Sequence, residues 1–128
     1  MMRMFLPRLL VIFLVLLGSF FWMPKEAKAA YLNHNCVVDQ VQLVASSLIS
    51  TGDRIAAKCE SPAPGGIYWF AYNITKEDET VKMVLSLLST ARVAGRSVLV
   101  SYESSDLSGD RWGCQSNDCR IIKKLEMR

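Results

Sequence analysis

Residues 75–103 constrain the fold more than any other stretch, because they predict one amphipathic helix that runs directly into a strand. Thr75, with Asp78 three residues later, predicts a capped helix start. Apolar residues then repeat at helical spacing at Val81, Val84, Leu85, Leu88 and Ala91, and Met83, Leu87 and Ala94 widen this stripe. Gly95 ends the helix as a left-handed cap. A helix with so wide an apolar face is expected to pack on a sheet.

The rest of the chain predicts five strands. The expected ranges are 37–45, 54–60, 67–73, 97–103 and 120–128, and residues 30–35 are expected to form a loose start. Three strands, one helix and two further strands form the element order of the OB-fold, a small Greek-key barrel. The predicted fold class is therefore all-β with one helix, a five-stranded OB-fold barrel of order β-β-β-α-β-β, with the helix closing one end.

Residues 1–29 have the composition of a secretory signal peptide. Arg3 and Arg8 precede an uncharged, mostly apolar run at 9–23, and the small-residue pattern Ala27-Lys28-Ala29 follows. The run is short for a membrane span, which needs about 20 apolar residues. We expect cleavage after Ala29, with an uncleaved anchor as the alternative. Residues 30–128 are then a single OB-fold domain, periplasmic or secreted, with no stable membrane span.

The charge of the chain belongs to this leader. The whole sequence has a net charge of +3. The leader accounts for all of it, with Arg3, Arg8, Lys25 and Lys28 against Glu26. Residues 30–128 are therefore neutral, with 11 basic and 11 acidic side chains. Nucleic acid is not expected as a partner, because its phosphates require a basic patch.

The four cysteines, Cys36, Cys59, Cys114 and Cys119, all lie in residues 30–128. An even count in a small exported domain predicts disulfides. Of the three connectivities, sequence separation favours Cys36–Cys59 and Cys114–Cys119. Cys36 and Cys59 would face each other across the first two strands, within disulfide reach. A metal site is the alternative, but there is no Cys-x-x-Cys pair and His34 is the only histidine, so neither metal nor cofactor is expected.

The sequence predicts no enzyme. His34 lies near the expected N-terminus without an evident nucleophile partner. The acids Glu60, Glu103, Asp106 and Asp110 are scattered over loops and strand ends. Strand 67–73 is apolar on both faces, which indicates a strand that is central or covered on both sides. Its aromatic residues have a second interpretation, as a stacking surface for bases or sugar rings.

Residues 88–103, followed by Cys114-x-x-x-x-Cys119, resemble the receptor-binding B subunits of AB5 toxins of the subtilase-cytotoxin type. Residues 106–109 and 113–120 also resemble small exported proteins of Gram-negative bacteria. The resemblance covers about the last third of the chain. It implies an OB barrel that assembles as a ring of five and binds sialylated glycans, with Tyr102 in contact with the sugar. Without the resemblance, Tyr102 would be a core or rim aromatic.

Two functions follow from these observations. The first is an exported binding module for a glycan, peptide or partner protein, with its site near Tyr102 or around the loop 104–112, where Trp112 is a candidate contact residue. Trp112 could equally cap the core. The alternative is a periplasmic structural or inhibitor-type protein that docks on an envelope protein through residues 112–119, which we call the cysteine loop.

Overall fold

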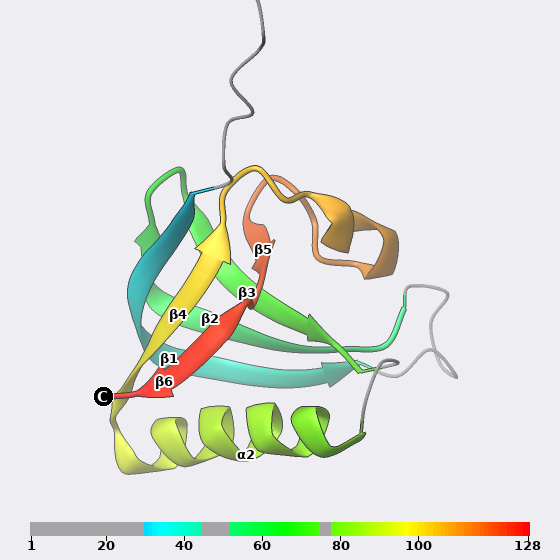
Figure 1. Ribbon diagram of the computed structural model, residues 1–128. Coiled ribbons are helices and arrows are strands. Elements are labelled where there is room, and N and C mark those ends of the chain that lie inside the picture. Colours follow the sequence, from blue (N-terminus) through cyan, green and yellow to red (C-terminus); the bar gives the residue numbers. More distant parts are fainter. Residues whose placement is uncertain (1–29, 45–51, 75–77) are drawn as a thin grey trace, which may run out of the picture.

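The computed structural model describes residues 30–44, 52–74 and 78–128, and the statements below concern these ranges (Figure 1). The predicted signal peptide, the helix cap at Thr75 and the turn between the first two strands lie outside them. The elements are, in chain order, β1 (Tyr31–Val44), β2 (Arg54–Ala63), β3 (Ile67–Asn73), α2 (Asp78–Ala94), β4 (Ser97–Glu103), the 3-10 helix η2 (Ser108–Trp112), β5 (Cys119–Ile121) and β6 (Lys124–Met127). The predicted class, mostly β with one α-helix, is confirmed.

The strands form one mixed sheet in the order β5-β3-β2-β1-β4-β6, curled into a half-barrel (Figure 1). Strand β1 makes the curl possible, because its first half pairs with β4 and its second half with β2. The register of the β1–β2 pair shifts between Val38 and Gln40, and such a bulge bends a strand and increases its twist. All strand pairs are antiparallel except β3 with β5.

The first and last strands differ from their predicted ranges. Strand β1 begins at Tyr31, so the loose start predicted for residues 30–35 is wrong. Residues Tyr31–Val37 are ordered by pairing with β4, a long-range partner that local sequence does not show. The predicted strand 120–128 is divided into β5 and β6, because β5 pairs with β3 and β6 with β4. Between them, the Ile122 N–H donates to the Ala71 carbonyl at 2.9 Å and the Lys123 N–H to the Ser101 carbonyl at 2.8 Å.

Helix α2 lies across one end of the half-barrel (Figure 1) and supplies a buried stripe. Val84, Leu88 and Ala91 are buried, and Val81, Leu85 and Leu87 pack around them. The predicted stripe wrongly included Met83, which is 70% exposed, and Ala94, which is also exposed. Across from the helix, Phe70 and Tyr102 are fully buried, with ring centroids 5.1 Å apart.

The predicted disulfide Cys36–Cys59 is confirmed, with the two Cα atoms 5.2 Å apart, and it lies in this inner core. The two cysteines are not cross-strand partners, however. Cys59 pairs with Val38, and Cys36 pairs with Val98 of β4. The facing arrangement predicted from spacing is therefore wrong, because β1 has already turned toward β4 at Cys36. The bond ties β2 to the point where β1 changes partner.

A second, smaller apolar cluster lies on the opposite face of β2 and β3. It contains Ala56, Ala71 and the disulfide Cys114–Cys119, with Trp69 and Trp112 packed against it. We call this group the outer cluster. Helix η2 and the cysteine loop cover this face of β3, and the Tyr68 and Trp69 N–H groups both donate to the Asp118 carbonyl. The prediction that strand 67–73 is covered on both sides is confirmed.

Candidate functional site

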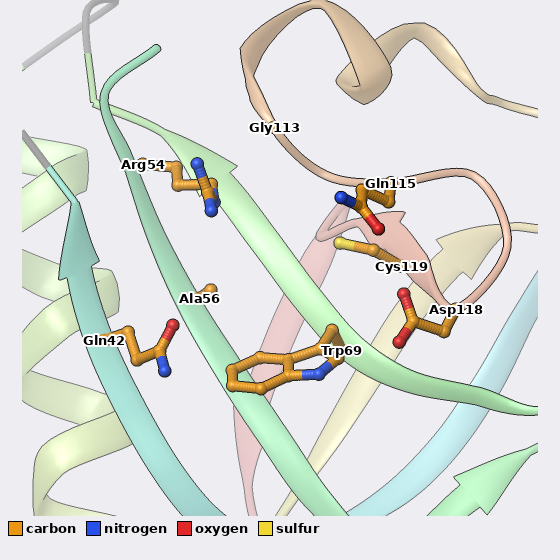
Figure 2. A pocket seen from close by; sticks show the side chains of 8 residues that line it. All are labelled: Gln42, Arg54, Ala56, Trp69, Gly113, Gln115, Asp118 and Cys119. Atoms are coloured by element: carbon orange, nitrogen blue, oxygen red, sulfur yellow. The ribbon is translucent and has the colours of Figure 1, made fainter. Parts of the chain in front are cut away.

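The outer cluster borders a cleft of ≈ 200 Å³ between the sheet and the cysteine loop. Side chains from β1 (Gln42), β2 (Arg54, Ala56) and β3 (Trp69) line one side. The cysteine loop lines the other, with Gln115 and Asp118 (Figure 2). In Figure 2 the polar side chains point toward the space above Ala56. Residues from three strands and one loop, far apart in the sequence, therefore form one recess.

Small side chains make room for this recess. Ala56 and Ala71 are direct cross-strand partners of the antiparallel pair β2–β3, so both point to the outer face. Both are buried, at 4% and 0% exposure. The half-buried indole of Trp69 lies beside this floor (Figure 2). Ala56 therefore forms a shallow floor, with Ala71 packed beside it and the large Trp69 ring at its border.

Arg54 is fixed at the rim by the backbone of the cysteine loop. Its Nη1 donates to the Trp112 carbonyl at 3.2 Å. Gly113 has a φ of +90°, and a Cβ at this position would collide with Arg54 Nη1. Glycine is required here for both reasons, since other residues rarely adopt this φ. The guanidinium is thus held against the loop, and it makes no other hydrogen bond to the described residues.

Asp118 is fixed on the other side of the cleft. Its carbonyl accepts the N–H groups of Tyr68 at 3.1 Å and Trp69 at 3.0 Å. The Cys119 N–H donates to the Gln115 carbonyl at 2.9 Å, and the adjacent disulfide closes the loop. Within the described residues, the Asp118 carboxylate has neither a hydrogen bond nor an ion pair. It is therefore a positioned and unused acceptor.

The predicted contact residue Tyr102 lies in the inner core. Its side chain has 0% exposure, so no surface ligand reaches it in this structure. Its hydroxyl is buried without a hydrogen-bond partner among the described residues. Burial raises the pKa of this phenol, and the charge of Arg120 lowers it by a smaller amount. Of the two readings of Tyr102, the structure shows the core aromatic.

The second predicted contact residue, Trp112, caps the outer cluster. It is half-buried, and it packs so closely on Gly52 that a Cβ at position 52 would lie 2.5 Å from the Trp112 Cβ. Its contribution to the cleft is the carbonyl that holds Arg54. Trp112 therefore supports the wall of the cleft.

Sequence reasoning missed Gln42, Arg54, Gln115 and Asp118 as candidate site residues. It did raise a stacking surface on strand 67–73, and Trp69 belongs to that strand. A usable signal was the alternation at Arg54-Ile-Ala56 and Trp69-Phe-Ala71, which puts small and polar residues on one face. Asp118 and Gln115 gave no signal, because their position depends on how the cysteine loop folds back onto β3.

His34 is part of the folded domain. It lies in β1, its ring stacks on Phe70 with centroids 6.0 Å apart, and Nε2 is 3.0 Å from the Ser61 carbonyl oxygen. The expected position near a loose N-terminus is therefore wrong. In the described ranges, no three His, Cys, Asp or Glu side chains gather as a metal site. In these same ranges no helix has the length and apolar composition to cross a bilayer.

Comparison with protein-family models, with curated proteins and with solved structures finds no match for this chain.

Proposed function

We propose that this chain is an exported, non-enzymatic binding module with an OB-type barrel, and that it binds a saccharide in the cleft. The observation that carries the proposal is the cleft itself, in which the Trp69 ring, two amides and two charged groups surround a floor of small residues. A sugar ring offers an apolar C–H face to an aromatic ring, and its hydroxyls both donate and accept hydrogen bonds.

Three features support the OB-type barrel. Helix α2 lies between β3 and β4, and the bent β1 pairs with both β2 and β4. Strands β5 and β6 form the two opposite edges of the sheet and follow each other in the sequence. Between them, backbone hydrogen bonds join Ile122 to Ala71 of β3 and Lys123 to Ser101 of β4. In OB-folds, the face of strands 2 and 3 with its flanking loops binds oligonucleotides and oligosaccharides. The cleft lies on the equivalent face here.

The size and charge of the cleft favour one sugar unit. Its volume of ≈ 200 Å³ is below the roughly 300–1,000 Å³ of pockets for drug-sized ligands. Residues 30–128 carry no excess positive charge for a nucleic acid backbone. The two disulfides support export, because such bonds persist in oxidising compartments. Together with the predicted leader, they support a periplasmic or secreted location.

A glycan array probed with residues 30–128 tests the proposal. It should include sialylated and plain glycans, and we expect binding that depends on Trp69. Trp69→Ala should weaken it by about 1–3 kcal/mol, the range for loss of a stacking aromatic. Tyr68→Ala is the matched control, since Tyr68 is 37% exposed on the same strand and does not line the cleft. Absence of binding to every glycan would refute the proposal.

The resemblance to toxin B subunits adds a proposed assembly, a ring of five copies. Sedimentation equilibrium of residues 30–128 tests it directly. A pentamer would support the toxin-like form of the function. A monomer would remove the ring and leave the saccharide cleft unaffected, because all its lining residues come from one chain.

The alternative function, docking on an envelope protein, is favoured by the shape of the cysteine loop. Gln115, Ser116 and Asn117 are exposed at its tip, and the disulfide holds them in place. A photo-crosslinking residue at position 117, in cells that export the protein, should then give one discrete adduct. If the saccharide proposal is correct, crosslinking will give no discrete adduct and soluble sugars will protect the Trp69 fluorescence from quenching.

A further inference from the structure

The cleft contains two opposite charges that do not pair with each other. Three ion pairs within the described residues lie away from this cleft: Glu79–Lys82, Asp106–Lys123 and Glu126–Lys124. Among the described residues, the Arg54 guanidinium donates only to the Trp112 carbonyl oxygen, and the Asp118 carboxylate has no partner. Charges that are partly withdrawn from water are costly unless a partner satisfies them.

Backbone contacts hold both charges in place. The Trp112 carbonyl and the space left by Gly113 fix the guanidinium of Arg54. Two N–H groups of β3 and the Cys114–Cys119 disulfide fix the backbone of Asp118. Groups positioned before binding lose little freedom when a ligand arrives, so such a site gains affinity from preorganisation. The two charges are therefore arranged as recognition elements.

Each charge selects one kind of group. The planar guanidinium of Arg54 matches a phosphate or carboxylate through paired hydrogen bonds. Asp118 and Trp69 both line the cleft, and Figure 2 shows the Asp118 carboxylate pointing toward the Trp69 indole. A carboxylate beside an indole ring favours an ammonium group, which both the negative charge and the ring face attract. The amides of Gln42 and Gln115 remain for sugar hydroxyls.

The geometry points to a zwitterionic sugar as the ligand, an amino sugar that also carries an acidic group. The acid binds Arg54 and the protonated amine lies between Asp118 and Trp69. This inference rests on the proposed saccharide function and narrows it to one ligand class.

Four matched probes test the inference: glucosamine 6-phosphate, glucosamine, glucose 6-phosphate and glucose. Each is titrated into residues 30–128 by calorimetry, with tryptophan fluorescence as a second readout. Glucosamine 6-phosphate should bind at least tenfold more tightly than glucose, and the two sugars that carry only one of the charged groups should fall between. Arg54→Gln should reduce the affinity for glucosamine 6-phosphate to that for glucosamine. Asp118→Asn should reduce it to that for glucose 6-phosphate.

Matched controls keep the test specific. Arg111 and Asp110 are exposed on η2 outside the cleft, so Arg111→Gln and Asp110→Asn should change no affinity. Thermal melting identifies any variant that fails to fold. Equal affinity for all four sugars would overturn the zwitterionic class. So would array binding of a neutral glycan without a response to glucosamine 6-phosphate, and the saccharide proposal would then stand. If no glycan on the array and none of the four sugars binds, both proposals are overturned.

Discussion

Strands β2 and β3 have two faces that differ in side-chain size and in charge. Their inner face contributes Ile55, Ala57 and Phe70 to a closed apolar core under α2. Their outer face presents Ala56 and Ala71, which leave a recess beside Trp69. Because side chains alternate along a strand, adjacent residues serve a core and a cleft at the same time. Ile55 and Phe70 help close the inner face, and Ala56 leaves space on the outer face.

The two disulfides are divided between these faces. Cys36–Cys59 belongs to the inner core, and Cys114–Cys119 belongs to the outer cluster. Arg54 and Asp118 lie at the outer cleft, whereas no polar or charged residue is buried in the described part of the inner core apart from the Tyr102 hydroxyl. The inner face is therefore expected to determine stability and the outer face to determine binding.

The largest stability effect is expected from the inner face. Leu88 has 0% exposure, so Leu88→Ala should lower the free energy of unfolding by about 2–5 kcal/mol through lost burial and a cavity. Urea denaturation measures it. Met83→Ala on the same helix is the control and should cost less than about 0.5 kcal/mol, because its side chain is 70% exposed. Equal effects of the two variants would contradict the assignment of the buried helix face.

The two disulfides should separate stability from binding. Replacing Cys36 and Cys59 by alanine frees a loop of 23 residues and should cost about 3 kcal/mol. Replacing Cys114 and Cys119 frees only 5 residues and should cost about 2 kcal/mol. Chemical denaturation and saccharide affinity are measured for both double variants. At temperatures where both variants are folded, only the Cys114/Cys119 variant should bind the saccharide more weakly, because Asp118 lies within the loop that this disulfide closes.

An opposite result would be informative. Equal loss of affinity in both double variants would mean that the cleft depends on the inner core as much as on the cysteine loop. The assignment of stability to the inner face and of binding to the outer face would then be wrong.

The fold was easier to predict than the site. Local patterns placed β3, β4 and most of α2, because alternation and helical spacing are properties of adjacent residues. The same patterns missed Tyr31–Val37 as a strand, since β4 supplies its partners from about 65 residues away. Tyr102 was a surface candidate only by resemblance, and alternation with Val98 and Val100 puts it on the buried face. The position of Asp118 could not be predicted, because it depends on how the cysteine loop folds onto β3, which is set by tertiary contacts.

Low pH should first loosen the segment that leads from β4 into η2, the short helix that covers part of the outer face of β3. Hydrogen bonds from Lys123, at 2.6 Å, and from Ser108 hold the pKa of Asp106 well below its ordinary 3.8. Because the folded pKa is depressed, this stabilisation is present above about pH 4 and is lost as the pH falls below it. Residues 30–128 contain two tryptophans, Trp69 and Trp112, both on the outer face. Tryptophan fluorescence should therefore change at a higher pH than far-ultraviolet circular dichroism.

Asp106→Asn supplies the control for this transition. It removes the charged pair, so it should cost about 1–2 kcal/mol at neutral pH, a value reduced by partial exposure. The acid-induced change in fluorescence should then be smaller than in the unmodified protein. Coincident fluorescence and dichroism transitions in both proteins would show that the two faces unfold as one unit.

The smallest stability effect is expected from Tyr102→Phe, which decides between the two proposed sugar contacts. The Tyr102 hydroxyl is buried without a partner among the described residues, and an unpaired buried polar group is unfavourable. Its removal should leave stability unchanged or raise it by about 1 kcal/mol, measured by urea denaturation. Saccharide affinity should not change, because the Tyr102 side chain has no exposed surface. If Tyr102→Phe loses binding and Trp69→Ala retains it, the sugar binds as in the toxin subunits, and the outer cleft is not the site.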